Sequence, residues 1–165
     1  MSGKSIIKAF LIGLLALGGA LATTPSILAQ DAPPATEEAK AIENLVNRAA
    51  TLIDKDGKAA FVEFRKKDSV WFHGDTYLFA YDMGANVLLN PAFPQREGTN
   101  VSGQKDSKGK LLHQAIIDTA KKGSGWVDYW FPKPGQTEPS HKWTYVKQVT
   151  IGGVSGLIAS GFFPQ

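Results

Sequence analysis

The chain has 165 residues, of which 43% are hydrophobic and 20% charged, an ordinary composition for one globular domain. Its formal net charge of +3 is not concentrated in a basic face, which argues against a nucleic-acid-binding protein. Cysteine is absent, so the sequence offers no disulfide, no thiolate metal site and no lipoprotein-type anchor.

The first thirty residues have the order of a secretory signal peptide. Two lysines precede an apolar run over 9–21, and a segment of small residues follows. We predict a signal peptide over 1–29, cleaved after Ala29, with Ala22 as the alternative site. The apolar run is short for a membrane-spanning helix, so an uncleaved anchor is the less favoured alternative. The protein is therefore expected in the periplasm or secreted, without membrane insertion after the signal is removed.

Residues 30–35 form a Pro-containing lead that we expect to be disordered, and 36–165 are expected to fold as a single domain. A long helix is predicted to begin near Thr36, a good N-cap, and to end between Asp54 and Gly57. Its apolar residues recur at three- and four-residue steps, namely Ala39, Ile42, Leu45, Val46, Ala49, Leu52 and Ile53. A second, short helix is predicted over 58–67, with buried positions at Phe61, Val62 and Phe64.

The middle of the chain predicts a β-hairpin, a long segment and a helix. Residues 77–82 are apolar on both faces, which is typical of a central strand with Tyr77, Phe79 and Tyr81 on one side, and residues 87–89 are expected to return beside it. The polar segment 90–109 is long for a compact domain and indicates a functional or flexible loop. A helix over 110–122 is expected to bury Leu111, Leu112, Ala115, Ile116 and Ala120.

The C-terminal part predicts three further strands. Runs of β-forming residues at 126–131 and 142–149 flank a Pro- and Gly-rich connector, as in a hairpin with a longer loop, and 156–163 is expected to be the last strand. Its glycines predict close backbone approach. Consecutive antiparallel strands with helices outside them indicate an α+β fold.

The aromatic hairpin also suggests a binding site. A carboxylate in an aromatic pocket needs a cation and hydrogen-bond donors, and Lys142 offers the charge while the hydroxyls of Tyr81, Tyr129 and Tyr145 are donors. In a regular strand Lys142 and Tyr145 point to opposite faces, so both line one pocket only if a bulge or twist intervenes. The alternative is that the aromatics are ordinary core and the lysine a solvated strand-end charge.

The order of these pieces resembles the single Cache domain of extracytoplasmic sensors (type 2), over about 57–163. The resemblance rests on the segments GDTYLFAYDMGANVLLNP, GWVDYWFPKPG and KWTYVKQV. It implies a PAS-like, five-stranded antiparallel sheet with the long helix on one face. On the other face it implies a pocket for a small organic acid, amino acid or amine.

The resemblance also implies site residues. The aromatic-Pro strand end of the family corresponds to Tyr129 and Phe131, and its Lys-x-x-Tyr-Val motif corresponds to Lys142 and Tyr145. The family's His-Pro pair is replaced by Asn90 and its proline neighbour here, and the terminal Gly-x-Tyr ends in phenylalanine. The loss of two hydrogen-bonding groups predicts a more apolar ligand.

Catalytic interpretations find little support. The three histidines are scattered over a turn, a helix and a loop, without metal-ligand spacing, and we expect neither a cofactor nor enzymatic activity. Two hypotheses remain. The first is an exported sensor domain that binds a small molecule and acts through a membrane signalling protein. The second is a periplasmic structural or interaction subunit that docks through exposed Trp130 and Trp143 and holds no ligand.

Overall fold

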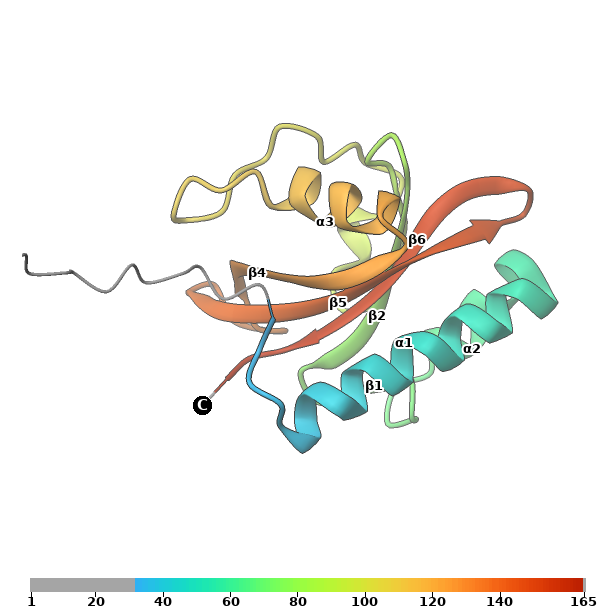
Figure 1. The fold of residues 1–165 in the computed structure, drawn as a ribbon, viewed down its shortest axis with the longest axis horizontal. Helices are drawn as coiled ribbons and strands as arrows, with labels where there is room; N and C mark the ends of the chain where they lie inside the picture. The colour runs from blue at the N-terminus through green and yellow to red at the C-terminus, as the bar shows by residue number, and fades with distance from the viewer. Residues whose placement is uncertain (1–31, 165) are drawn as a thin grey trace, which may run out of the picture.

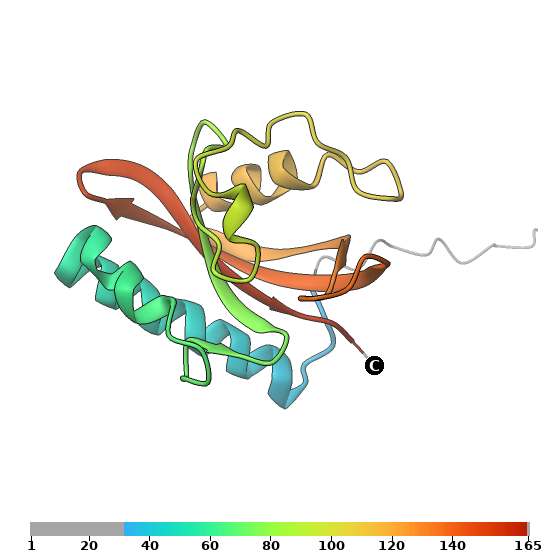
Figure 2. The ribbon, with the colours of Figure 1, turned by 180° about the vertical axis from the view of Figure 1, so that it is seen from behind.

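A computed structural model describes residues 32–164, so the predicted signal peptide lies outside the described part of the chain. One antiparallel sheet separates two layers: helices α1 and α2 cover one face, while helix α3 and the segment 90–109 cover the other (Figure 1, Figure 2). The predicted α+β class is confirmed. No helix within 32–164 combines the length and apolar character needed to cross a membrane.

Helix α1 (Glu37–Asp56) begins and ends where the sequence predicts. The Thr36 hydroxyl accepts a hydrogen bond from the Ala39 amide at 3.1 Å, which caps the first turn. Gly57 ends the helix with a φ of 58°, a left-handed conformation that glycine adopts at little cost. The buried stripe packs on β5 and β6 and consists of Ala39, Ile42, Leu45, Val46, Ala49, Ala50 and Ile53.

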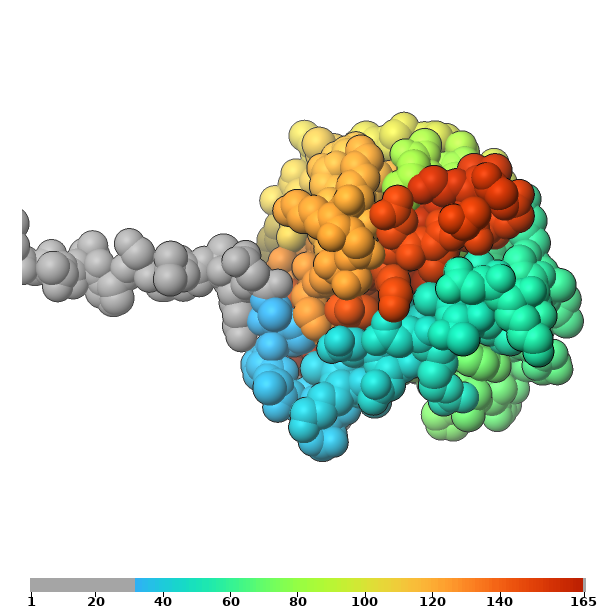
Figure 3. All heavy atoms as spheres, turned by 45° about the vertical axis from the view of Figure 1, so that its right-hand side comes forward, coloured from blue at the N-terminus to red at the C-terminus, as the bar shows by residue number. Residues whose placement is uncertain are grey.

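The second helical segment is a 3-10 turn (Gly57–Ala60) that continues into α2 (Phe61–Phe64). Phe61 and Phe64 are buried against the α1 layer, as predicted. The prediction for Val62 is wrong, because its side chain is 65% exposed. A helix this short buries one side only, and Val62 lies on the other. In Figure 3 the β5–β6 turn, in red, lies beside the C-terminal end of the helical layer, in teal.

The sheet has six strands rather than the five that were predicted, in the order β1-β2-β6-β5-β4, with β3 paired to β2. The additional strand, β1, has only two residues, too few for a recognisable sequence pattern. The strands are β1 (Phe72–His73), β2 (Thr76–Asp82), β3 (Val87–Leu89), β4 (Ser124–Pro132), β5 (Pro139–Ile151) and β6 (Val154–Phe162).

Strand alternation divides the core into two clusters, one on each face of the sheet. From β2, Leu78 and Ala80 face the α1 layer, whereas Tyr77, Phe79 and Tyr81 face α3, as predicted. The α3-side cluster therefore collects most of the tyrosines together with aromatic residues from β4. This face carries the candidate site.

Helix α3 (Leu112–Lys121) begins two residues later than predicted. Leu111 stands at its N-cap and is 44% exposed, so its predicted burial is wrong. His113 and Ile117 are buried instead. Before this helix, the segment 90–109 contains a 3-10 turn at Pro94–Arg96. Phe93 and Val101 of this segment pack in the core cluster on the α3 side of the sheet.

The predicted close backbone approach in the last strand is confirmed at Gly161. A Cβ at this position would lie 2.5 Å from Thr144 Oγ1 and 2.9 Å from Lys142 Cε, and would collide with the Trp143 carbonyl oxygen. Only glycine leaves room for the Lys142 side chain to pass over β6.

We expect Gly161→Ala to lower the free energy of unfolding by about 1–3 kcal/mol, because the added methyl group overpacks the β5–β6 pair. Urea denaturation followed by tryptophan fluorescence measures this loss. Ser155→Ala, on the exposed part of the same strand, is the control and should change stability by less than about 0.5 kcal/mol. Equal stability of the Gly161→Ala variant and the parent would contradict the packing argument.

Candidate ligand-binding site

The centre of the site is Lys142, a lysine with 0% exposure on β5. Its ammonium nitrogen donates a hydrogen bond to the Tyr77 hydroxyl at 3.0 Å and lies 4.3 Å from the centre of that ring. The rings of Phe79, Phe131 and Phe163 lie at 5.8, 5.8 and 5.0 Å from the same nitrogen. Lys142 thus occupies an aromatic cage in which cation–π attraction replaces part of its hydration.

The charge of Lys142 is not balanced by a neighbouring acid. No carboxylate of residues 32–164 lies within 4.0 Å of its ammonium nitrogen. Burial lowers the pKa of Lys142 to about 7, and the more distant Asp75 opposes this shift. At neutral pH the lysine is therefore close to half protonated, and an anion beside it would favour the charged form.

Two predicted tyrosines belong to the same face. The Tyr129 hydroxyl shares a hydrogen bond of 2.9 Å with the Thr144 hydroxyl, and both side chains are buried. Tyr81 is buried with its ring 5.5 Å from that of His113. Burial raises the pKa of both Tyr81 and Tyr129, so their hydroxyls stay neutral and keep a proton to donate.

Phe131 joins the sheet to the segment that covers it. Its ring packs edge-on against Tyr129 at 6.1 Å and against Phe93 at 5.4 Å. Phe93 in turn lies 6.0 Å from the Tyr77 ring. The sequence did not single out Phe93, although an aromatic residue within a long polar segment is a signal for one that folds back onto a core.

Asn90 lies at the end of β3 and is 3% exposed. Its side-chain oxygen accepts a hydrogen bond from the Phe93 amide at 3.1 Å, and its own amide donates to Glu97 at 2.7 Å. Glu97 also forms a two-point ion pair with Arg65, at 2.6 and 2.8 Å. Asn90 thus fixes the start of the covering segment, and through it the position of Phe93.

Arg96, which was not among the predicted site residues, is a second cation close to the Phe131 ring. Arg96, in the 3-10 turn of the covering segment, holds its guanidinium 5.5 Å from the centre of Phe131. Its Nη2 donates to Gln104 at 2.9 Å and contacts His113 Nε2 at 3.1 Å. Burial and the charge of Arg96 lower the pKa of His113 to about 4, so this histidine is neutral at pH 7.

Tyr145 is not brought together with Lys142. The pairing of β5 with β4 and β6 runs without a register shift, so strict alternation places Tyr145 on the α1 face. There its hydroxyl donates to Ser124 at 3.1 Å and its ring lies 5.2 Å from that of Trp126. The other five predicted residues lie on the opposite face or at its edge.

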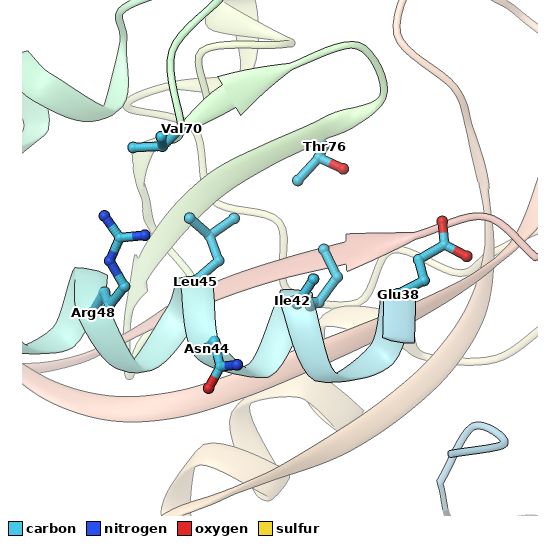
Figure 4. Close-up of a pocket in the computed structure, with 8 residues that line it drawn as sticks. Glu38, Ile42, Asn44, Leu45, Arg48, Val70 and Thr76 are labelled. Atoms are coloured by element: carbon cyan, nitrogen blue, oxygen red, sulfur yellow. The ribbon is translucent and has the colours of Figure 1, made fainter. Parts of the chain in front are cut away.

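The Lys142 site is closed to solvent, because no part of the lysine is exposed. The Tyr77 hydroxyl bonds to the ammonium group, and Tyr77 and Tyr129 are themselves buried. A groove of about 370 Å³ lies elsewhere, between α1 and the β1–β2 end of the sheet (Figure 4), and includes Glu38, Ile42, Asn44, Leu45, Arg48, Val70 and Thr76. None of the predicted site residues lines this groove. A ligand would therefore reach Lys142 only if part of its surroundings moved.

The described residues contain no group of three histidine, aspartate or glutamate side chains arranged for a metal ion. His141 Nε2 lies 3.1 Å from one oxygen of the Asp128 carboxylate, and Lys110 contacts the other oxygen at 2.8 Å. Hydrogen bonds to both groups lower the pKa of Asp128 despite its partial burial.

Comparison with known proteins identifies the family of this chain. A sequence profile described as a Cache domain matches residues 35–154. The chain belongs to the Cache domain family. This family supplies sensory, ligand-binding domains to chemoreceptors and sensor kinases, and the resemblance seen in the sequence is thereby confirmed.

Two curated relatives share part of the sequence. The methyl-accepting chemotaxis protein McpP of Pseudomonas putida is 30% identical over 90 residues, which are 54% of this chain and 16% of that protein. The sensor histidine kinase MctS of Rhizobium johnstonii is 32% identical over 119 residues, 67% of this chain and 26% of the kinase. The chain thus spans about a quarter or less of the curated relatives it matches.

Solved structures agree with the Cache fold. The periplasmic sensor domain of a chemotaxis protein matches with a TM-score of 0.60 and 30% identity, over 76% of this chain and 90% of that one. A Cache chemosensory domain from work on carboxylic acid recognition matches with a TM-score of 0.60 and 24% identity, over 76% and 87% of the two chains. The second likeness shows the fold alone.

We expect Lys142→Met to raise the free energy of unfolding at pH 7 by about 2–4 kcal/mol, because it removes a desolvated charge without leaving a cavity. In the folded parent the lysine pKa is about 7, against 10.5 in the unfolded chain. Between these values the unfolded chain binds more protons, so the parent should gain stability as pH rises from 7 to about 9.

The Lys142→Met variant should lack this gain, whereas Lys105→Met, at an exposed lysine, should keep it. Urea denaturation at several pH values measures all three proteins. A parallel pH profile in the parent and Lys142→Met would mean that Lys142 is not the buried titrating group.

Proposed function

We propose that this Cache domain is an extracytoplasmic sensor domain that binds a small organic acid at Lys142. The single observation that carries the proposal is the fully buried ammonium group in an aromatic cage without a balancing carboxylate. A buried charge without a partner costs several kcal/mol, and groups with pKa values shifted by burial cluster at functional sites.

The surrounding groups favour an anion over an amine. Lys142 and Arg96 approach the same Phe131 ring from two elements, while the nearest acid that influences Lys142 is Asp75 at a longer range. Asp75 is itself 3.6 Å from Lys133 and is partly exposed. An ammonium ligand would meet two positive charges here, whereas a carboxylate would meet two cations and the neutral hydroxyls of Tyr77 and Tyr129.

The proposed role is recognition without catalysis. The relatives are a chemoreceptor and a sensor kinase, which suggests that a membrane signalling protein reads the state of this domain. The similarity to a periplasmic sensor domain, together with the signal-peptide pattern at 1–29, supports a periplasmic or secreted location.

The alternative role, docking through an exposed aromatic hairpin, has less support. Trp143 is 5% exposed and belongs to the α1-side core, so it offers no docking surface. Trp130 is half-buried, and the ammonium group of Lys108 lies 4.8 Å from its ring. One partly covered tryptophan is a small anchor compared with the cluster that a protein interface usually needs.

A thermal-shift screen of small carboxylates, amino acids and amines tests the ligand class. A carboxylate at a hundredfold excess over its dissociation constant should stabilise the protein by about 2.7 kcal/mol. Lys142→Ala and Tyr129→Phe should reduce this gain, because each removes a group at the proposed site. Tyr145→Phe, which alters a tyrosine on the opposite face, is the matched control and should bind as the parent does. Stabilisation by amines alone would contradict the proposal.

Binding should also depend on pH. A carboxylate pairs with the protonated form of Lys142, whose pKa is about 7 before the ligand binds. From pH 7 to about pH 9 the affinity should therefore fall, by up to about tenfold for each unit while the ligand stays ionised. Isothermal titration calorimetry in buffers of different ionisation heat would detect the accompanying proton uptake. Constant affinity without proton uptake over this range would exclude Lys142 as the ligand's partner.

A further inference from the structure

We propose that Arg96 and His113 form a second anion-binding position beside Lys142, so that the preferred ligand is a short dicarboxylate. This inference rests on the proposed function, because it names the class of acid that the same site would select. It assigns a specificity role to two residues that the sequence patterns did not indicate.

Arg96 is the first reason. Its Nε is buried and has no hydrogen-bond acceptor within residues 32–164, although Nη2 bonds to Gln104. No carboxylate in that range forms an ion pair with its guanidinium. The nearby Glu97 is engaged by Arg65 instead. A buried N–H of a charged group without an acceptor is costly, and a ligand oxygen would satisfy it.

His113 is the second reason. Its side chain is 2% exposed, and its Nε2 accepts the hydrogen bond that Arg96 Nη2 donates. The proton of the neutral ring is therefore on Nδ1, which is buried and also lacks an acceptor within the described chain. Arg96 and His113 thus form a corner of the site, called the Arg96–His113 corner, with two unpaired hydrogen-bond donors. An acceptor-rich group fits there, whereas an alkyl end of a ligand would leave both donors unpaired.

The Arg96–His113 corner and the aromatic cage of Lys142 share the Phe131 ring. The Arg96 guanidinium lies 5.5 Å and the Lys142 ammonium 5.8 Å from the centre of the same Phe131 ring. The charge of Arg96 also acts on the hydroxyls of Tyr77, Tyr81 and Tyr129, which share this face of the sheet. A ligand with a carboxylate at each end would pair with both cations.

The two cations belong to different parts of the fold. Lys142 and Tyr129 belong to the sheet, whereas Arg96 belongs to the covering segment 90–109. A ligand with one carboxylate would engage the sheet alone. A dicarboxylate would join the sheet to the covering segment, and would therefore be bound more tightly than a monocarboxylate of equal length.

Isothermal titration calorimetry of the full exported chain at pH 7 tests this with pairs of equal carbon number: malonate and propionate, succinate and butyrate, glutarate and valerate. At least one dicarboxylate should bind at least tenfold more tightly than its partner. Arg96→Gln should remove this preference by weakening the dicarboxylate at least tenfold, while the monocarboxylate changes by less than about threefold. Thermal melting without ligand verifies that the variant is folded.

Arg48→Gln, the same substitution on the α1 side of the sheet, is the matched control and should leave every affinity unchanged. If monocarboxylates bind in a Lys142-dependent manner but no dicarboxylate is preferred, the second position is refuted while the proposed function stands. Equal weakening of both ligands by Arg96→Gln would also refute it, because Arg96 would then support the fold of the site generally. If none of the six acids binds the parent, both the proposed function and this inference fail.

Discussion

The structure depends on a lysine ammonium that has been taken out of water. Burial of Lys142 is unfavourable by itself, and the surrounding sheet is arranged to reduce that cost with aromatic rings and one tyrosine hydroxyl. The cage does not include an acid, so the compensation is incomplete. The pKa of Lys142 is lowered because these contacts replace only part of the hydration that burial removes.

Each element of the fold contributes to this arrangement in a specific way. Strand alternation in β5 directs Lys142 to the α3 side, and Gly161 on β6 leaves room for its alkyl chain. β2 supplies Tyr77 and Phe79 from the same face. The covering segment completes the enclosure with Phe93, which the buried Asn90 holds in place. The α1 layer, by contrast, provides stability through a separate apolar core.

Much of the fold could be predicted from the sequence, because long periodic segments determine their own structure. The stripe of α1, the two-faced apolar pattern of β2 and the aromatic hairpin all have signals of many residues. The two-residue strand β1 and the burial of Val62 and Leu111 were misjudged, since short elements lack enough residues to define a face. For the site, strand alternation correctly predicted that the Lys142 and Tyr145 side chains point to opposite faces of the sheet. Arg96, Phe93 and His113 were missed because their positions depend on how an irregular segment folds back, which periodicity does not encode.

The Glu97 carboxylate connects regions that the sheet otherwise keeps apart. One of its oxygens bonds to both the Asn90 amide and Arg65, and the second bonds to Arg65 alone. Arg65 directly follows α2, which is continuous with the end of α1. The covering segment is thus tethered to the helical layer by a short, charged crosslink. A displacement of that segment would stretch or break this ion pair, which is partly exposed and therefore a weak restraint.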